Sequence, residues 1–256
     1  MIAGQCLAAT DTMWMITFSK DHGQVLRTAL ILAHRLNALE IDFVCEMFSP
    51  EHAGDVESER KMAVRFALSP DDAPCRALKE AFADLLQTVT PAPPSEADVA
   101  DLRTCLGKIE NISAAPQGRA SAVFSTPELS SLRTACELYS RLAIGQGWVV
   151  AGYLGCPEHV TDEILAFDRR YREIFFPELR GDAYYGINSQ LVHDNARVAW
   201  DVLQVVRQHL AFDALGKTVG RDKRDVRVMK GPEFDDPMQR SRLELVTCTR
   251  MPQERV

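Results

Sequence analysis

The chain has 256 residues, of which 46% are hydrophobic and 25% charged, a composition typical of folded proteins and unlike that of disordered chains. Its length allows one large domain or two of ordinary size. The formal net charge of −7 disfavours a nonspecific grip on nucleic-acid phosphates, which needs clustered lysine and arginine. The densest basic run, 217–227, is broken by glycine and aspartate and is interpreted as a solvated loop.

Seven cysteines are spread along the chain without a CxxC pair or a close grouping with histidine. This spacing is poor for zinc, and an odd number is poor for a disulfide framework, so a reducing cytoplasm is the expected location. The N-terminus has no basic segment followed by an apolar one, and no uncharged apolar run is long enough to cross a bilayer. We therefore expect neither secretion nor a membrane-spanning helix.

The first predicted elements are a strand and a helix. Residues 13–18 are typical of a short strand, and Ser19 is a suitable N-cap for the helix that follows. This helix is predicted over about 25–48 and is apolar on most of its circumference. One side of it must face a core, and the rest needs cover from elsewhere in the chain or from another molecule. We therefore expect an internal pseudo-twofold arrangement or a homo-oligomer.

A sequence pattern in the first half returns in the second. Phe18-Ser19 recurs as Phe124-Ser125, and Leu26-Arg27-Thr28-Ala29 recurs as Leu132-Arg133-Thr134-Ala135, both at an offset of 106. A further match, D-x-L-Q-x-V, begins at Asp84 and again at Asp201, at an offset of 117. We infer a duplicated unit. The predicted domains are a first repeat at 1–92, a linker at 93–120 that opens with prolines, a second repeat at 121–213 and a tail at 214–256.

The second copy opens in the same way as the first. Ser125, followed by Pro127 and Glu128, predicts the start of a helix, because these residues satisfy free N–H groups and suit the helix dipole. The stretch Gly145-Gln146-Gly147 lies at the end of this apolar helix. We interpret it as a C-cap turn rather than a ligand loop.

Two further helices are predicted in the second copy, at about 161–175 with Thr161 as its cap, and at about 194–212. Beyond residue 212 glycine and proline interrupt the chain, and 226–229 and 243–248 are typical of strands. We expect a small sheet in which these strands pair with the strands that open the copies. The predicted fold class is mainly α (α+β), a duplicated helical unit with a small sheet.

Three motifs carry a resemblance to a known family: ELYSRLAIGQ at 137–146, ARVAWDVLQVVR at 196–207 and FDDP at 234–237. Through them the chain from 121 to about 247 resembles a family of uncharacterised bacteriophage and prophage proteins. The resemblance implies phage or mobile-element genes acting in a bacterial cytoplasm, and it implies no reaction, because the family has no assigned activity. The first copy departs from the motif, with Ala33-His34 for Tyr139-Ser140 and Leu39-Glu40 for Gly145-Gln146. A site at these positions is therefore expected in the second copy alone.

A polar stripe on the 194–212 helix is the leading candidate for a binding surface. The stripe consists of four polar residues whose spacing places them on one side of the helix: Arg197, Asp201, Gln204 and Gln208. A solvated face explains this stripe simply. The alternative is a groove in which the stripe faces the other motif helix. The candidate ligand-binding residues are then Tyr139, Arg141, Gln146, Arg197, Asp201, Gln204 and Arg207.

From these residues we predict a noncatalytic phage-type accessory or counter-defence protein. It would bind a host or phage protein, or sequester a small polar ligand that contains phosphate, such as a signalling nucleotide held by arginine forks and an aromatic face. No cofactor is expected, and neither nucleic acid nor a membrane is an expected partner. A structural or virion-associated oligomer, built through the apolar first helix, is a further alternative.

A metal-dependent phosphohydrolase of the HD type is the alternative from a different functional class. His159, His193 and Asp194 supply the imidazole and carboxylate groups with which such enzymes hold a cation that activates water. A helix N-cap is the simpler interpretation of Asp194 and Asn195. The sequence contains no GxxxxGK[ST] or GxGxxG phosphate loop and no GxSxG elbow, which excludes nucleotide hydrolysis through a P-loop.

Overall fold

Three strands from distant parts of the chain form one antiparallel sheet. β1 (Met13–Ser19) lies in the middle, between β2 (Arg119–Ser125) and β5 (Thr247–Arg250). Alternate side chains of β1, among them Trp14 and Phe18, are buried, because successive residues of a strand face opposite sides. The predicted pairing of the tail with the strands that open the copies is therefore confirmed. The predicted fold class, mainly helical with a small sheet, is confirmed with it.

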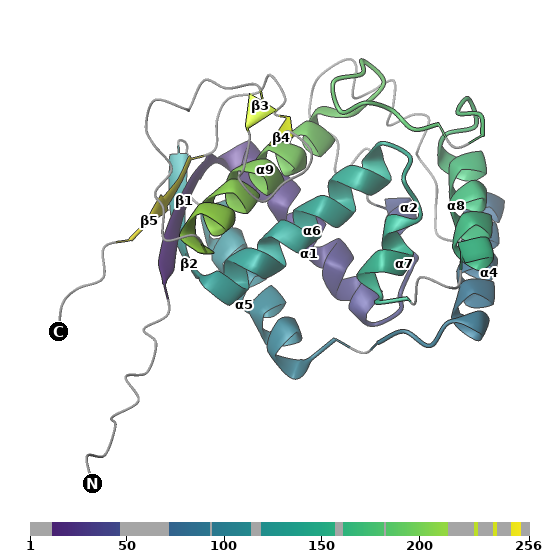
Figure 1. Cartoon of the computed structure of the whole chain (residues 1–256), viewed down its shortest axis with the longest axis horizontal. Helices are drawn as coiled ribbons and strands as arrows, with labels where there is room; N and C mark the ends of the chain where they lie inside the picture. The colour runs from purple at the N-terminus through teal and green to yellow at the C-terminus, as the bar shows by residue number, and fades with distance from the viewer. Residues whose placement is uncertain are drawn as a thin grey trace, which may run out of the picture.

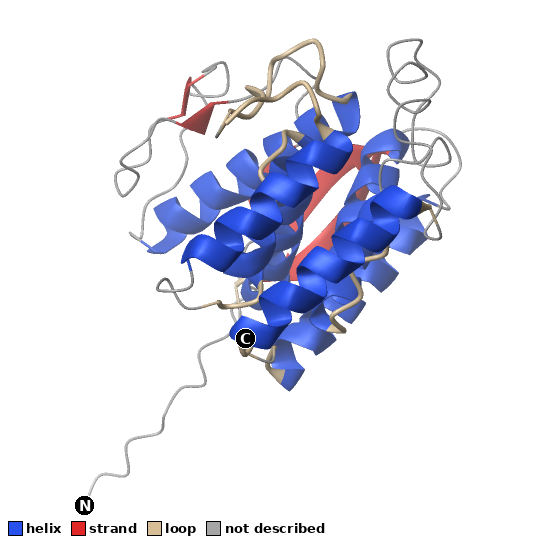
Figure 2. Ribbon diagram, turned by 90° about the vertical axis from the view of Figure 1, so that its right-hand side faces the viewer, coloured by secondary structure: helices blue, strands red, loops and turns tan. Residues whose placement is uncertain are grey.

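The computed structural model describes residues 12–46, 72–92, 94–113, 119–156, 161–181, 183–214, 228–229, 238–239 and 247–251. Within these ranges eight helices stack on one side of the sheet (Figures 1 and 2). Two short strands, β3 (Val228–Met229) and β4 (Met238–Gln239), form a separate antiparallel pair. None of the helices in these ranges is long and apolar enough to span a membrane.

The register between β1 and β2 is symmetric about one residue pair. Ile16 lies opposite Ala122, which is its own counterpart at the offset of 106. Met13 lies opposite Ser125. The counterpart of Met13 is Arg119 and that of Ser125 is Ser19, and these two residues also lie opposite each other. An approximate twofold axis through the centre of the β1–β2 pair accounts for this register.

Helices of the two halves begin at matching positions. α1 (Lys20–Asn37) and α6 (Thr126–Ala143) have 18 residues each, and both ends of α6 lie 106 residues after those of α1. α2 (Phe43–Glu46) and α7 (Val149–Tyr153) also start 106 residues apart. α1 packs against α6. Part of the cover that the apolar first helix needs therefore comes from the same chain.

The helix predicted over about 25–48 ends earlier, at Asn37. Residues 38–42 are not helical, and Leu39 has a φ of 60, in the left-handed region that terminates helices. The N–H of Glu40 donates to the carbonyl of Arg35 over 2.9 Å and closes the helix end. The apolar pattern continued past this point because α2 is also buried, so periodicity alone gave no sign of the break.

Four more helices complete the fold. α5 (Glu96–Ser113) packs against α1, and α9 (Asp194–Ala214) packs against α6. α4 (Ala73–Thr88) and α8 (Thr161–Phe175) pack against each other. The two helices predicted in the second copy are thus confirmed as α8 and α9.

The segment expected to be a linker, 93–120, contains α5 rather than a flexible connection. Leu102, Cys105 and Ile109 of this helix are buried in the core. The sequence match at an offset of 117 pairs α4 with α9, whereas element order and packing place α5 in the position of α9. Asp84 is exposed and Asp201 is buried, so this match does not mark equivalent places.

The predicted N-cap at Ser125 is confirmed and also links two helices. The Ser125 hydroxyl accepts the N–H of Glu128 over 3.4 Å, and the Glu128 carboxylate accepts the N–H of Ser125 over 2.7 Å. This reciprocal pair satisfies two N–H groups that a helix start leaves unpaired. Lys108 of α5 donates to the same carboxylate at 2.6 Å, so the cap also fixes α5 to the start of α6.

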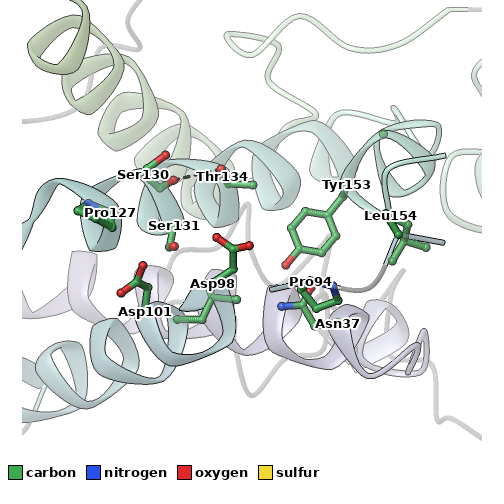
Figure 3. A pocket seen from close by; sticks show the side chains of 13 residues that line it. Asn37, Pro94, Asp98, Asp101, Pro127, Ser130, Ser131, Thr134, Tyr153 and Leu154 are labelled. Carbon is green, nitrogen blue, oxygen red and sulfur yellow. Dashed lines mark hydrogen bonds between the residues drawn. The ribbon is translucent and has the colours of Figure 1, made fainter. Parts of the chain in front are cut away.

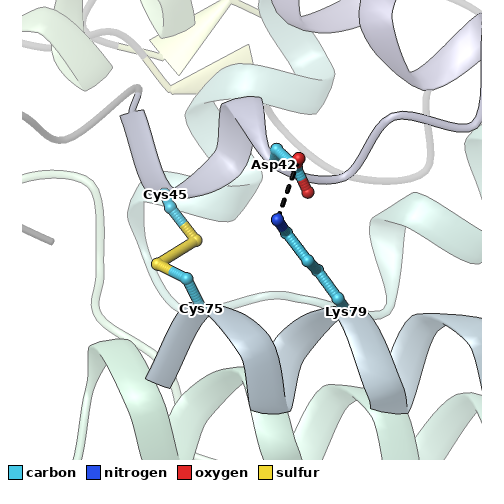
Figure 4. Close-up of a disulfide and its surroundings, with 4 residues drawn as sticks. All are labelled: Asp42, Cys45, Cys75 and Lys79. Carbon is cyan, nitrogen blue, oxygen red and sulfur yellow. Dashed lines mark ion pairs between the residues drawn. A yellow bond between two sulfur atoms is a disulfide. The ribbon is translucent and has the colours of Figure 1, made fainter. Parts of the chain in front are cut away.

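A disulfide joins Cys45 of α2 to Cys75 of α4, with their Cα atoms 6.2 Å apart (Figure 4). The ion pair between Asp42 and Lys79, at 3.0 Å, lies beside it. The sequence analysis expected no disulfide framework. An odd number of cysteines and the lack of a paired motif do not reveal which thiols the fold brings together, and this pairing depends on the contact between two separate helices.

Candidate functional site

The polar stripe on α9 lies inside the protein. Asp201 and Gln204 are each 1% exposed, and Gln208 is 2% exposed. The side-chain oxygens of Gln204 and Gln208 accept no hydrogen bond within the described part of the chain. This burial corrects the interpretation of the stripe as a solvated face. It also places Asp201 and Gln204 within the packed interior.

Two predicted ligand-binding residues of the 137–146 motif, Arg141 and Gln146, meet at the end of α6. Arg141 donates from Nη1 to the Gln146 side chain over 3.0 Å and from Nε to Glu137 over 2.9 Å. The indole of Trp148 lies 5.6 Å from the Arg141 guanidinium. Gln146 is buried, as is Tyr139. These contacts engage the Arg141 guanidinium in holding the turn after α6.

That turn is the C-cap predicted from the glycines. Gly145 has a φ of 93, and its N–H donates to the carbonyl of Leu142 over 3.0 Å. The N–H of Gln146 donates to the carbonyl of Arg141 over 3.0 Å. A Cβ added to Gly147 would lie 2.7 Å from the Tyr171 ring, so glycine is required there for close packing. Both glycines therefore have structural roles.

The arginines of α9 are not brought together. Arg197 donates from Nη2 to the carbonyl of Ser189 over 2.6 Å and from Nε to that of Ile187 over 3.2 Å, and it pairs with Asp194. It thereby fixes the preceding loop to the start of α9. Arg207 lies ten residues along the same helix, roughly 15 Å away at the ordinary helical rise. The two cannot form one fork around a phosphate.

The alternative metal residues do not meet within the described ranges. His159 lies outside these ranges, and Asp194 pairs with Arg197. His193 Nδ1 accepts the N–H of Asn195 over 3.0 Å, so His193 itself caps α9 in place of the predicted Asp194 or Asn195. Burial lowers the pKa of His193 to about 4. No group of three potential metal ligands occurs in the part of the chain that the structure describes.

A pocket of about 460 Å³ lies elsewhere, between α5 and α6 and bounded by the end of α1 and by α7 (Figure 3). Its volume is within the usual range for sites that bind small molecules. The N–H of Ala92 donates to the carbonyl of Leu154 over 3.1 Å, which fixes the chain before α5 against α7. The lining residues are Asn37, Ala92, Pro94, Asp98, Asp101, Leu102, Pro127, Ser130, Ser131, Thr134, Gly152, Tyr153 and Leu154.

Carboxylates and hydroxyls face each other across this pocket. Asp98 and Asp101 lie on α5, and Ser130, Ser131 and Thr134 lie on α6 (Figure 3). The i, i+3 spacing of the two aspartates places them on one side of their helix. The pocket lining therefore contains two acidic side chains and no lysine, arginine or histidine.

The two aspartates differ in their surroundings. Asp98 completes a capping box at the start of α5, where its Oδ2 accepts the hydroxyl of Ser95 over 2.7 Å. Asp101 forms no hydrogen bond or ion pair with any described residue. Burial raises the pKa of Asp101, and the negative charges of Glu128 and Asp98 raise it further, while Lys108 opposes the shift.

The far end of the pocket is held by Tyr153. Its hydroxyl donates to the carbonyl of Ala33 on α1 over 3.0 Å. Burial raises the pKa of this phenol, although its hydrogen bond with Asn37 opposes the shift. Tyr153 thus fixes the position of α7 against the end of α1, and the wall of the pocket with it.

Some polar lining residues have apolar counterparts on the other side of the approximate twofold axis. At the offset of 106, Ser131 corresponds to Val25 and Asn37 to Ala143, both buried apolar residues. Thr134 corresponds to Thr28, which is 3% exposed and donates to the carbonyl of Gln24. Two polar lining residues, one from each half, therefore have counterparts in the core, so this part of the lining is specific to one side of the molecule.

This pocket was not predicted from the sequence, because the residues 93–120 that form one of its walls were predicted to be a linker. Once 96–113 is known to be helical, the acidic pair at i, i+3 is a visible signal on one helix face. The sequence matches no protein-family model and no curated protein, and the fold matches no solved structure.

Proposed function

We propose that this protein binds a small polar molecule, without catalysis, in the pocket between α5, α6 and α7. The observation that carries the proposal is the convergence of polar side chains from separate helices on one cavity of about 460 Å³. At the offset of 106, the polar lining residues Ser131 and Asn37 have the buried apolar counterparts Val25 and Ala143. Polar groups that line an open space instead suit a ligand with matching groups.

The lining chemistry favours binding over reaction. Asp98 is engaged in the cap of α5, and the α6 residues supply hydroxyl groups with no histidine or lysine among the lining residues to activate them. The pocket offers hydrogen-bond acceptors, donors and negative charge. These groups orient a polar ligand and select it by its charge.

The setting that we propose is the one implied by the resemblance of the second half to phage and prophage proteins. A protein that sequesters a small molecule in a bacterial cytoplasm would suit a counter-defence role. The acidic lining does not favour a phosphate-containing ligand such as a signalling nucleotide, because like charges repel at short range. A host or phage protein as partner, and a homo-oligomeric state, stay predictions.

We further propose that the fold arose by internal duplication of a β-α-α unit. The matching bounds of α1 and α6, and the symmetric β1–β2 register, support this origin. On this view the ancestral unit paired with a second copy through the same strand edge. The pocket, which parts of both copies line, then kept or gained polar side chains, while the equivalent place received apolar side chains such as Val25 and Ala143.

The test of the binding proposal is native mass spectrometry of the protein purified gently from a bacterial host, combined with thermal-shift screening against small polar molecules. We expect a copurified or added molecule to bind and to be lost on denaturation. In Ser131→Phe, which fills the pocket from α6, binding should disappear. Thr104→Phe, an exposed position on α5, is the matched control and should bind normally. A ligand that binds the Ser131 variant equally well would contradict the assignment of the pocket.

A further inference from the structure

We infer that the ligand of this pocket is an organic cation, an amine that also carries hydrogen-bonding groups. The inference rests on the proposed function and narrows it to a class of ligand. It begins from the charge of the lining residues. Asp98 and Asp101 contribute carboxylates, and none of the lining residues contributes a positive charge.

The negative charge of Asp101 is not matched by a neighbour in the described ranges. Lys108 is the nearby cation that influences it, yet Lys108 donates to both oxygens of Glu128, at 2.7 and 2.6 Å. Glu128 therefore takes the contact that Lys108 could otherwise offer. The raised pKa of Asp101 agrees with this arrangement, because the surrounding negative charge and burial disfavour its ionised form. A cationic ligand in the pocket could pair with the Asp101 carboxylate.

The pocket suits a molecule rather than a bare metal ion. Calcium and magnesium need about six oxygen ligands gathered within roughly 2–2.6 Å of one point. No group of three metal-binding side chains occurs within the described ranges, and the volume of about 460 Å³ is that of an organic ligand. An ion alone would leave most of this space unfilled.

The walls of the pocket provide oxygen acceptors for an ammonium group and hydroxyl groups that can bond to other polar groups of the ligand. An ammonium has three N–H donors and no acceptor, so it requires several oxygen atoms around it. Asp98 and Asp101 approach from α5, and the hydroxyl of Ser131 on α6 lies across from them (Figure 3). Hydroxyl groups can also donate to acceptors on the ligand, so an amino sugar, which has hydroxyl groups beside its ammonium group, fits this lining better than a purely apolar amine.

The experiment compares related sugars that carry positive, no or negative charge, with a polyamine as a second cationic ligand. Titration calorimetry and ligand-observed NMR would measure binding of glucosamine, glucose and glucose phosphate, and of spermidine, to the full chain. We expect the amines to bind at least tenfold more tightly than the neutral sugar, a difference of about 1.4 kcal/mol. Asp101→Asn should weaken amine binding about tenfold, and added salt should weaken it as well. Asp84→Asn removes the same charge at an exposed site on α4 and should bind amines normally.

Each result separates this inference from the proposed function. Equal binding of glucosamine and glucose, or preferential binding of the phosphate, would overturn the cationic ligand while leaving a pocket that binds polar molecules. Amine binding that is unchanged in Asp101→Asn and lost in Ser131→Phe would overturn the role of the acidic wall. Failure of all these probes in the folded protein would overturn the inference, and the copurification experiment would then decide the proposed function alone.

Discussion

Leu39 occupies in the first half of the chain the backbone position that Gly145 occupies in the second. Both lie in the left-handed region, with φ of 60 and 93. In each half, the N–H of this residue and the N–H of the next one donate to carbonyls in the last turn of the preceding helix. Even the side-chain contact recurs, since Arg35 pairs with Glu40 as Arg141 bonds with Gln146. The fold therefore has the same turn in both halves, although the first half lacks the glycine that suits it.

Replacing Leu39 with glycine should stabilise the protein. A side chain in the left-handed region costs about 1–2 kcal/mol, and glycine removes most of this cost at a helix C-cap. Because Leu39 is 43% exposed, little packing is lost. We expect the free energy of unfolding to rise by about 1 kcal/mol, measured by urea denaturation. In Ala38→Gly, at the preceding exposed position, it should fall instead, because the glycine there only adds freedom to the unfolded chain.

The reciprocal change tests the same relationship. In Gly145→Ala the new Cβ would lie 2.8 Å from the Leu179 side chain, in addition to the backbone cost. The free energy of unfolding should fall by about 2 kcal/mol. A stable Gly145→Ala protein would mean that the two turns tolerate side chains equally, and the stabilisation expected for Leu39→Gly would lose its basis.

Asp168 and Arg172 form a buried pair whose disruption should be costly. Their side chains are 7% and 8% exposed and lie 2.8 Å apart. Asp168 also accepts the N–H of Trp148 over 2.9 Å, and Arg172 donates to the carbonyl of Gly181. Burial raises the pKa of Asp168 although these partners oppose the shift. Asp168→Ala should lower the free energy of unfolding by about 3 kcal/mol, because it removes the carboxylate that pairs with the buried Arg172 guanidinium and accepts the N–H of Trp148.

A second ion pair on the same helix provides the control. Arg170 and Glu173 are also joined over 3.0 Å, but their side chains are 47% and 54% exposed. Glu173→Ala should change the free energy of unfolding by less than about 1 kcal/mol, since exposed pairs contribute little. Similar losses in both variants, measured by urea denaturation, would show that Asp168 does not act through its buried contacts.

The parts of the fold that local chemistry determines were predictable from the sequence. Ser125 and Glu128 have the spacing of a capping box, and Gly145 has the place and residue type of a C-cap. The pairing of the tail with the opening strands followed from the strand-like runs. These predictions depend on a few neighbouring residues, so a single sequence contains enough information for them.

The candidate site depended on contacts that no local pattern encodes. The arginines and glutamines of the motif helices looked like ligand contacts, yet Gln146 and Gln204 are buried and Arg197 holds a loop. Polar residues on a helix that is buried on most sides have the same spacing as those on a surface. Asp101 was hidden in a presumed linker, because prolines before α5 suggested a break without showing that a helix follows. Only the packing of α5 on α1 distinguishes these cases.

The disulfide between Cys45 and Cys75 should stabilise the folded state. It closes a loop with a sequence separation of 30. Restricting the unfolded chain to such a loop is worth about 3–4 kcal/mol in the loop-entropy account. We expect the urea midpoint of the oxidised protein to fall when a reductant is added, and thiol titration of the denatured protein to show two more free thiols after reduction.

Variants of this pair separate the cross-link from other effects of the reductant. Cys75→Ser should have a lower urea midpoint than the oxidised protein and should not respond to reductant. Cys156→Ser removes a free, partly exposed thiol and should behave as the parent. If protein isolated from a reducing cytoplasm contains all its thiols free and has the same midpoint as after oxidation, the cross-link does not contribute to stability.

Acid should destabilise the protein through two histidines. Burial lowers the pKa values of His193 and His209 to about 4, from 6.5 for a solvent-exposed histidine. Between these values the unfolded chain binds protons that the folded chain does not. The stabilisation is therefore complete above pH 6.5 and is lost as the pH falls towards 4. Each pKa unit corresponds to about 1.4 kcal/mol, so each histidine contributes at most about 3 kcal/mol to this loss.

His209 provides the clearer variant, because its ring contacts the Trp14 indole edge-on at 5.9 Å and desolvation alone causes its shift. In His209→Leu the apolar contact is largely kept and the proton-binding group is removed. The decrease in the free energy of unfolding between pH 6.5 and 4.5, followed by urea denaturation, should then be clearly smaller than in the parent. His193→Gln should also reduce this pH dependence, but with a loss at neutral pH, since it alters the acceptor that caps α9. Identical pH profiles for the parent and His209→Leu would mean that His209 is protonated as readily in the folded protein as in the unfolded chain.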